Sequence, residues 1–497
     1  MSVLRYGIFR TERRRALKGS VKKRAAALCA ALVTAALLCG CGGSYEYKTG
    51  DVDWYSTCSR DGKYIHDTYY YSDDWFGEKP EKDIEGMALA SMQLAASAMT
   101  DDENGSGAAF LKSMGFDEVG FSDFRSADPD DFNYTWGRKT LDDGTTLVAI
   151  AVQSASEDVS VRNKGWKQNF TVNGDSSSGE HFAYAKAVDK MIDGIADLGT
   201  GDKVKYWITG HSRGGAIANV LAAHLPDRLG DRNAGIYAYT FEAPATADEE
   251  TAGSGNYGYI HNYLCSDDFV TMIPGWNMTR YGESRELTDK KRDEKLSDEL
   301  KSLGSDAADQ KMRITVQADA DRLAANIAAA VPTREDYSKE RTDKVTASDG
   351  TVREIKYTYQ DSMVKLMDFI FSGDGDAGES PLKKLMGSKD EVMDSAEHLA
   401  EGLKLARSGK DPSAEYWTAA EGIYRTMQDT GSAGNLTEED LYEILCLAAP
   451  VLIDFPEGSS EPSYDLLTDV AGYSEDLTYS HQFDTVIARL KLLAPAP

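Results

Sequence analysis

The sequence predicts an α/β fold with a mostly parallel central sheet and a large all-helical insertion. Between residues 145 and 270, short runs of β-branched and aromatic residues alternate with amphipathic helical stretches, which is the order of βαβ crossovers. From about Glu283 to about Asp465, charged and amphipathic helical stretches follow one another between polar loops. The 497 residues, 41% of them hydrophobic, suffice for a large core or for two domains.

The first 40 residues have the composition of a targeting segment, so they take no part in the predicted fold. Nine Lys and Arg residues stand there against Glu12 alone, and a short apolar run from Ala25 to Leu38 follows them. The next residues, Leu38-Cys39-Gly40-Cys41, resemble a bacterial lipoprotein signal, which implies a lipid on Cys41. The apolar run is shorter than the roughly 18 residues of a spanning helix, and an uncleaved anchor is the alternative. Both interpretations place the body outside the cytoplasm, tethered to the cell membrane by its N-terminus.

The rest of the chain is strongly acidic and poor in cysteine. The formal charge is −28, and because residues 1–40 contribute +8, the remainder carries −36. Such a body is not expected to bind nucleic acid, since phosphate contacts need clustered Lys and Arg. Beyond Cys41 only Cys58, Cys265 and Cys446 remain. Three cysteines form at most one disulfide, which argues against a disulfide scaffold, and no C-x-x-C pair indicates a zinc site.

The predicted elements of the core follow in chain order. Residues 41–80 are polar and rich in tyrosine, and we expect them to form a tether. Apolar periodicity and terminal glycines predict helices, and runs of β-formers predict strands between them. The helices are Lys82–Met99, Ala108–Phe116, His181–Gly199 and Arg213–Leu225; the strands are Thr145–Ser154, Lys203–Gly210, Gly235–Pro244 and Tyr257–Asp268.

The stretch YWITGHSRGG, from Tyr206 to Gly215, contains a G-x-S-x-G motif centred on Ser212. In a glycine-rich chain the motif alone decides little, but here a predicted strand precedes it and a small-residue helix follows it. The glycines leave room for a tight, strained turn, and backbone N–H groups at the helix N-terminus favour an oxyanion. This context favours a catalytic nucleophile over an ordinary serine between glycines.

A serine nucleophile needs a histidine base, which an acidic side chain orients. Four histidines follow Ser212 in the chain: His224, His261, His398 and His481. The first three fall within a predicted helix, strand and charged helix, whereas His481 follows a loop and opens the final helix, so we favour His481. Asp267 and Asp268 lie just past a predicted strand, where parallel sheets carry catalytic groups, and one of them is expected to be a turn former.

With these motifs the chain resembles the class 3 (fungal-type) lipase family, which has the α/β-hydrolase fold. The resemblance rests on ITGHSRGGAIANVLAAHL, YTFEAP and DDFVTMIP, and covers about residues 85–282 and the tail from about 470. It aligns Asp268 with the family's acid and His481 with its C-terminal histidine. It also implies that the N–H of Arg213 and one N–H from Ala155 or Ser156 hold the oxyanion.

Three departures from the family pattern stand out. Arg213 replaces the usual leucine beside the nucleophile, and Gln153-Ser154-Ala155 stands in place of R-G-[ST]. The gap of 213 residues between the acid and the histidine is far longer than usual, and the helical insertion fills it. A lid is expected over Ser156–Phe170, with Trp166 and Phe170 as its apolar residues; a surface loop or a cap formed by the insertion is the alternative.

The resemblance divides the chain into five parts. These are a lipoprotein signal peptide (1–40), a polar N-terminal tether (41–80), an α/β-hydrolase core (81–282), a helical insertion or cap (283–465), and a C-terminal part of the core carrying the histidine (466–497). The implied function is a lipid-anchored serine ester hydrolase acting on an ester or lipid substrate, without a metal or cofactor. An amidase or acyltransferase would use the same triad. The alternative of another class is a non-catalytic surface lipoprotein that binds a ligand or partner.

Overall fold

A computed structural model gives the structure of the chain, which divides into two units, Met1–Glu46 and Tyr47–Pro497. All the elements below belong to the second unit. The structure describes residues 45–56, 63–99, 105–122, 132–153, 169–173, 179–199, 203–230, 235–275, 278–309, 314–371, 385, 388–434, 436–456, 459–473 and 479–497.

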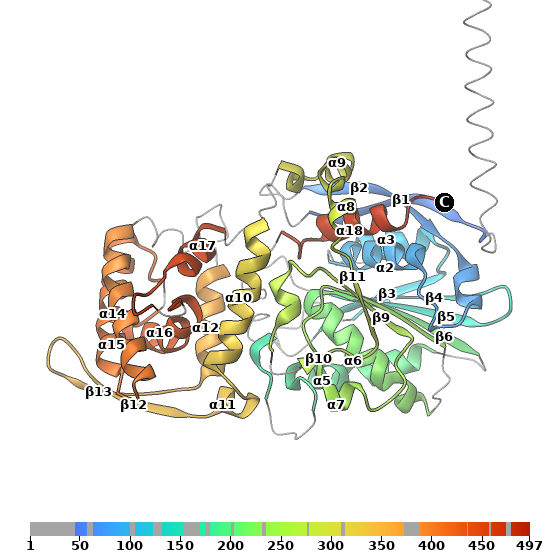
Figure 1. Cartoon of the computed structure of the whole chain (residues 1–497). Helices are drawn as coiled ribbons and strands as arrows, with labels where there is room; N and C mark the ends of the chain where they lie inside the picture. Colours follow the sequence, from blue (N-terminus) through green and yellow to red (C-terminus); the bar gives the residue numbers. More distant parts are fainter. Residues whose placement is uncertain are drawn as a thin grey trace, which may run out of the picture. The chain divides into compact units, whose positions relative to one another are not determined.

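A mixed seven-stranded sheet is the centre of the core (Figure 1). Its order is β11 (Glu283–Glu286), β9 (Ile260–Leu264), β7 (Gly235–Phe241), β6 (Val204–His211), β5 (Thr146–Val152), β4 (Tyr134–Thr140) and β3 (Glu118–Phe121). The strands from β5 to β11 run parallel, whereas β4 and β3 are antiparallel. The sheet is therefore mostly parallel, as the alternation of strands and helices predicts.

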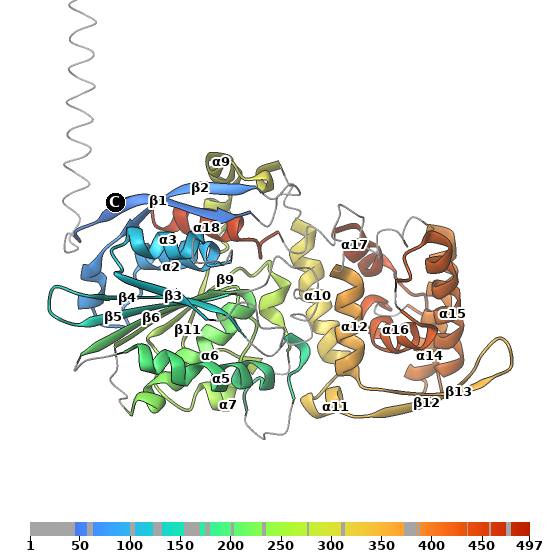
Figure 2. The ribbon, with the colours of Figure 1, turned by 180° about the vertical axis from the view of Figure 1, so that it is seen from behind.

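Helices cover both faces of this sheet (Figures 1 and 2). The helices of this part are α2 (Glu85–Ser97), α3 (Ser106–Ser113), α5 (Phe182–Leu198), α6 (Ser212–Leu229), α7 (Glu249–Ala252) and α18 (Phe483–Leu493). Side chains of β6 alternate between the faces, as the two-residue period of a strand requires. Trp207 donates a hydrogen bond to Ser91 Oγ of α2 at 2.8 Å, while Tyr206 and Ile208 pack in the core beneath α5 and α6.

The segment expected to be a polar tether is instead part of the folded body. Strands β1 (Lys48–Tyr55) and β2 (Tyr64–Tyr71) pair antiparallel, and the short helix η1 (Asp73–Gly77) follows them. Trp54 is fully buried and lies within 3.4 Å of Asp484 on α18, and Ser56 Oγ donates to the same carboxylate at 2.7 Å. Alternate apolar side chains among the polar ones bury one face of this hairpin, a period of two that the overall polarity hides.

The sheet also continues past residue 282, where the helical insertion was expected to begin. Strand β11 pairs parallel with β9 at the edge of the sheet. Helices α8 (Lys290–Asp293) and α9 (Leu296–Leu303) then contact α18 of the core, and α9 is followed by η3 (Asp306–Asp309). A charged, helical composition does not exclude four residues of edge strand, because the edge exposes its side chains to water.

The segment that follows is mostly helical, but it is not all-helical as expected. Its helices are α10 (Ile314–Ala330), α11 (Arg334–Ser338), α12 (Tyr359–Phe371), α14 (Lys389–Arg407), α15 (Ser413–Thr430), α16 (Glu438–Leu452) and α17 (Asp465–Tyr473). Strands β12 (Arg341–Thr346) and β13 (Val352–Tyr357) form an antiparallel hairpin among them. Its turn holds Gly350 at φ +84°, and buried Val345 and Ile355 give each strand an inward face.

This helical segment shares a continuous apolar core with a loop of the sheet domain. The short helix η2 (Phe269–Met272) follows β9, and its Phe269 and Val270 belong to the same buried cluster as Leu323 and Ile327 of α10. Arg334 of α11 also donates a hydrogen bond to the Val172 carbonyl at 2.7 Å. The apolar side chains of the loop after β9 are thus packed against the helical segment.

Two expectations about the N-terminus and the cysteines concern residues that are only partly described. In the part of the chain that the structure describes, no helix is long and apolar enough to cross a membrane. Residues 25–38, Cys41 and Cys58 lie outside the described residues. Cys265 and Cys446 are buried free thiols.

Candidate active site

Ser212 lies at the junction of β6 and α6, in a backbone conformation that non-glycine residues rarely adopt. Its φ is +55°, in the left-handed region, which costs a non-glycine residue about 1–3 kcal/mol. Strand β6 ends at His211 and α6 begins at Ser212 itself. The turn from strand to helix therefore projects the serine at the carboxyl edge of the sheet, beside the positive end of the helix dipole.

Two glycines of the motif make this turn possible because backbones pass close to them. A Cβ on Gly210 would lie 2.3 Å from the carbonyl oxygen of Gly214. A Cβ on Gly214 would lie 2.5 Å from the carbonyl oxygen of Val152, on the neighbouring strand β5. Any larger residue at either position would push the backbone that carries Ser212.

Three side chains distant in the sequence form one chain of hydrogen bonds at Ser212. The Oγ of Ser212 lies 2.7 Å from Nε2 of His481, and Nδ1 of His481 lies 2.6 Å from Oδ2 of Asp268. Asp268 is fully buried, whereas the His481 side chain keeps 17% of its surface exposed. This is the geometry of a nucleophile, a base and an orienting acid.

The backbone around Asp268 holds its carboxylate in place. The Val270 N–H donates to Asp268 Oδ1 at 3.0 Å, which leaves Oδ2 to accept from the imidazole. The Asp268 N–H donates to the Cys265 carbonyl at 3.0 Å and closes the turn after β9. Both carboxylate oxygens are thus directed before any substrate arrives.

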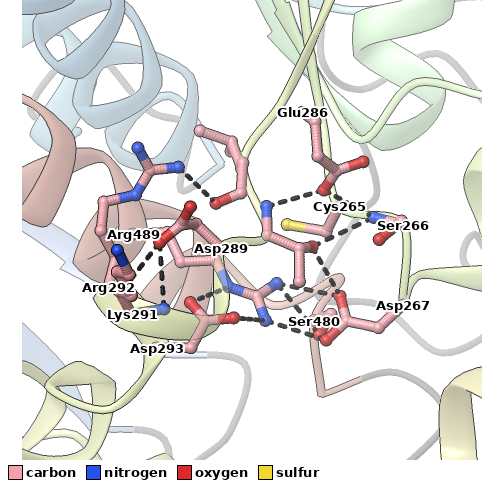
Figure 3. A network of polar contacts seen from close by, with 12 residues as sticks. Cys265, Ser266, Asp267, Glu286, Asp289, Lys291, Arg292, Asp293, Ser480 and Arg489 are labelled. Atoms are coloured by element: carbon pink, nitrogen blue, oxygen red, sulfur yellow. Dashed lines mark hydrogen bonds and ion pairs between the residues drawn. The ribbon is translucent and has the colours of Figure 1, made fainter.

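The neighbouring Asp267 has a different partner, the buried Arg489 of α18 (Figure 3). The Arg489 guanidinium donates to both Asp267 oxygens, at 3.0 and 2.8 Å, and to Ser480 Oγ at 3.2 Å. Burial alone would raise the pKa of Asp267, but the Arg489 hydrogen bonds outweigh it and hold that pKa below its usual value. Because Asp267 and Ser480 directly precede Asp268 and His481, one guanidinium positions both loops of the site.

The other candidate histidines lie away from Ser212, each with a partner of its own. His224 is 2.6 Å from Glu180 Oε1, His261 is 3.0 Å from the Pro80 carbonyl, and His398 is 2.7 Å from Glu415 Oε2. Each of these three histidines is thus hydrogen-bonded within the helix or strand that the sequence predicts for it.

His211, which no motif in the sequence marks as functional, packs against the imidazole of the proposed base His481. It is buried, and its ring centroid lies 4.8 Å from that of His481 and 4.6 Å from that of Phe483. Burial lowers the pKa of His211 well below its ordinary value, so the ring is neutral and packs as an aromatic surface. Position alone, one residue before the nucleophile, was the only signal in the sequence.

Of the predicted oxyanion donors, the structure describes Arg213 but not Ala155 or Ser156. Arg213 occupies the first turn of α6, where a helix leaves its backbone N–H groups without intrahelical partners. Its guanidinium lies 5.0 Å from the Phe132 ring centroid, and burial lowers its pKa to about 10. Ala155, Ser156 and Trp166 lie outside the described residues, whereas Phe170 is buried in the cluster shared with the helical segment.

The described residues were compared with the ligand sets that bind metal ions in proteins. Within the described ranges, no group of three or more His, Cys, Asp or Glu side chains is arranged to hold one.

Comparisons with known proteins give a match over part of the chain. Residues 144–278 match the family described as Lipase (class 3), a stretch that includes Ser212 and Asp268 but not His481. No curated protein matches the sequence.

Among solved structures, the chain is similar to several lipases at low identity. One is a triacylglycerol lipase described as having a serine protease triad as its catalytic centre (18% identity, 41% of this chain and 80% of that chain, TM-score 0.32). Another is the Rhizomucor miehei lipase in complex with its propeptide (17%, 41% and 68%, TM-score 0.31). A third is the Lip2 lipase from Yarrowia lipolytica (12%, 41% and 77%, TM-score 0.29).

Proposed function

We propose that this protein is a serine hydrolase that cleaves carboxylic esters through an acyl-enzyme. The observation that carries the proposal is the unbroken hydrogen-bond chain from Ser212 Oγ through His481 to the buried Asp268. The strained serine at a helix N-terminus supports it further, because a merely structural serine has no need of that conformation. The match of residues 144–278 to Lipase (class 3) supports an ester as the substrate.

Each residue has one task in the proposed reaction. Ser212 Oγ attacks the ester carbonyl carbon as its proton passes to His481 Nε2, and Asp268 stabilises the imidazolium that forms. His481 then gives the proton to the leaving alkoxide, and the C–O bond breaks. Water attacks the acyl-enzyme by the same route and releases the acid. The N–H of Arg213, with one from Ala155 or Ser156, stabilises the negative oxygen in both halves.

We propose that the helical segment forms a second wall of the site. Phe269 and Val270 directly follow Asp268 and share their apolar core with Leu323 and Ile327 of α10. An apolar side next to the acid loop suits the acyl chain of a glyceride or phospholipid. We propose that residues from about 314 to 473 act as a cap over this side of the site.

We also propose that the chain is a bacterial lipoprotein, held outside the cytoplasm by a lipid on Cys41. The basic residues before Arg24, the apolar run from Ala25 and the small residues before Cys41 support this location. Mass spectrometry of the N-terminal peptide from cell membranes is expected to find a diacylated Cys41 as the first residue. A peptide that begins at Met1 and carries no lipid would contradict the anchor.

The activity is tested by hydrolysis of p-nitrophenyl esters of short and long acids, and of a triglyceride, by residues 45–497. Wild-type protein is expected to release product from at least one ester class, and His481→Ala to lower turnover about a million-fold, because the triad acts as a unit. His398→Ala, in the helical segment, is the matched control and should keep wild-type rates. A wild type no faster than His481→Ala on every ester would indicate a binding protein instead.

A further inference from the structure

The guanidinium of Arg213, the residue after the proposed nucleophile, has no polar partner among the described residues. Its Nε is buried without a hydrogen-bond acceptor, and no carboxylate in the described part of the chain forms an ion pair with it. Its contact is with the ring of Phe132, whose centroid lies 5.0 Å from the guanidinium carbon. A cation that is partly removed from water without an anion lowers the stability of a fold, so its presence here needs a reason.

The other arginines around the proposed site have acceptors for their N–H groups. Arg489 donates to both oxygens of Asp267, and Arg280 donates through Nε to the Ala243 carbonyl at 2.6 Å. The fold thus supplies an oxygen to each arginine that holds its loops together. Arg213 receives none from the described residues, as expected of a cation whose acceptor arrives with a ligand.

The register of the sheet places Phe132 at the level of the nucleophile. Val152 of β5 pairs with Tyr134 of β4 on one side and with Gly210 of β6 on the other. Phe132 and Ser212 each lie two residues beyond these partners, toward the carboxyl edge of β5. Neighbouring strands are about 4.8 Å apart, so the two positions are separated by roughly 10 Å. The guanidinium that contacts this ring therefore lies at the same edge of the sheet as the proposed site.

The proposed acid and the apolar wall lie on the opposite side of Ser212. The strands are ordered β9, β7, β6, β5 and β4, so Asp268, which follows β9, and Phe132, which precedes β4, lie on either side of the serine. Phe269 and Val270 line the side of the acid, which the proposed function assigns to the acyl chain. The alcohol part of the ester then extends toward the guanidinium.

A guanidinium in this arrangement suits an anionic oxygen group. An aromatic ring occupies the face of a guanidinium and leaves the N–H groups at its edge to bind a carboxylate or a phosphate. Burial lowers the pKa of Arg213 to about 10, which still leaves the group charged at neutral pH. The residue keeps part of its surface exposed, so its N–H groups are not sealed from a ligand.

We infer that Arg213 is a specificity-determining residue that binds an anionic group, a phosphate or a carboxylate, on the alcohol part of the ester substrate. The phosphate of an acylglycerol phosphate is a few bonds from the ester oxygen, which suits the short separation between Ser212 and the guanidinium. The inference rests on the proposed function, since it names the substrate class of the same site.

Three butyryl esters given to the whole protein test this role. They are neutral 1-monobutyrin, 1-butyrylglycerol 3-phosphate and 3-butyryloxypropanoate. The wild type should prefer an anionic ester about 10- to 100-fold in kcat/KM, the effect of a charge-assisted hydrogen bond, and the better anion identifies the group. Arg213→Met keeps the length of the side chain and should abolish the preference. Arg213→Lys keeps the charge without the planar fork and should retain part of it.

Two controls separate this role from general effects of charge. Arg228→Met removes an exposed arginine that pairs with Asp193 at the other end of α6, and it should keep the wild-type preference. An anion on the acyl part, in p-nitrophenyl hydrogen glutarate compared with p-nitrophenyl hexanoate, should bring no preference that depends on Arg213. A wild type that does not distinguish the three butyryl esters, or an Arg213→Met variant that still does, would overturn the inference.

Binding of the anion is measurable without any hydrolysis. Glycerol 3-phosphate should raise the melting temperature of the wild type but not that of Arg213→Met. Without this probe, Arg213→Met should melt no lower than the wild type, because it removes an unpaired cation. If no ester is hydrolysed while the probe stabilises only the wild type, the proposed function fails and the anion site stands. If esters are hydrolysed with neither a preference nor a stabilisation, the inference fails alone.

Discussion

Ser212→Ala is expected to lower ester turnover by about a million-fold while leaving the protein folded. The variant removes only the Oγ that hydrogen-bonds His481 at 2.7 Å, and it leaves His481 and Asp268 in contact. Because alanine adopts the same backbone and the glycines still provide the turn, the melting temperature should stay close to that of the wild type. Single-turnover kinetics with a long-chain p-nitrophenyl ester measure the loss.

A surface serine provides the control for this prediction. Ser254 is exposed, and its hydroxyl donates to the Thr251 carbonyl at 2.7 Å and to no residue of the triad. Ser254→Ala should keep the wild-type rate. If Ser212→Ala retained more than about a tenth of that rate, another nucleophile would carry the reaction.

The substitutions Asp267→Asn and Asp268→Asn of the two adjacent acids are expected to have different effects. The first should lower the stability of the fold and the second should lower the turnover. Asp268→Asn keeps the shape but presents an amide to His481 Nδ1, so the imidazole loses its orientation and turnover should fall about 10⁴-fold. Its stability should change little in comparison. Asp267→Asn removes the charge that pairs with the buried Arg489 at 2.8 Å, which should cost about 3–5 kcal/mol of folding free energy.

Urea unfolding and steady-state kinetics on the same preparations distinguish these two acids. Measured on folded protein, Asp267→Asn should lose much less activity than Asp268→Asn. Equal kinetic losses with unchanged stability in both variants would mean that the pair is not divided between catalysis and structure. The division follows from the contacts, because only Asp268 faces the imidazole while Asp267 faces α18.

The sequence predicted the three residues that the structure brings together because each carries a local signal. Ser212 has its strand, glycines and helix, and His481 directly precedes the last helix. Asp268 follows a strand end together with Asp267, and the resemblance to the lipase family selected Asp268 between them. Their catalytic role stays a prediction that the experiments above address. The parallel order of the sheet followed from the same alternation of strands and helices.

What the sequence did not predict depends on contacts between distant segments. Arg489 is one cation among many in the sequence, and only the packing of α18 places it beside both Asp267 and Ser480. Glu242 looks like any polar residue after a strand until the turn after β9 brings the Cys265 N–H within 3.0 Å of its buried carboxyl.

The missed strands have a similar cause. The β1–β2 hairpin hides its buried face among tyrosines and aspartates, and β11 lies at the start of a charged stretch. The β12–β13 hairpin is short and lies in a segment that is otherwise helical, so helical periodicity dominates its surroundings. In each case tertiary packing selects a strand where composition indicates a loop or a helix.

We propose that Ser212 is an activated nucleophile, and a phosphonate label shows this in the intact mass of the protein after treatment with an alkyl phosphonate ester. We expect one phosphonyl adduct per chain in the wild type, located on the peptide that contains Ser212, and none in Ser212→Ala. His481→Ala should form the same adduct far more slowly, because the serine then lacks its base. A wild type that stays unmodified, or an adduct that persists in Ser212→Ala, would show that Ser212 is not the activated nucleophile.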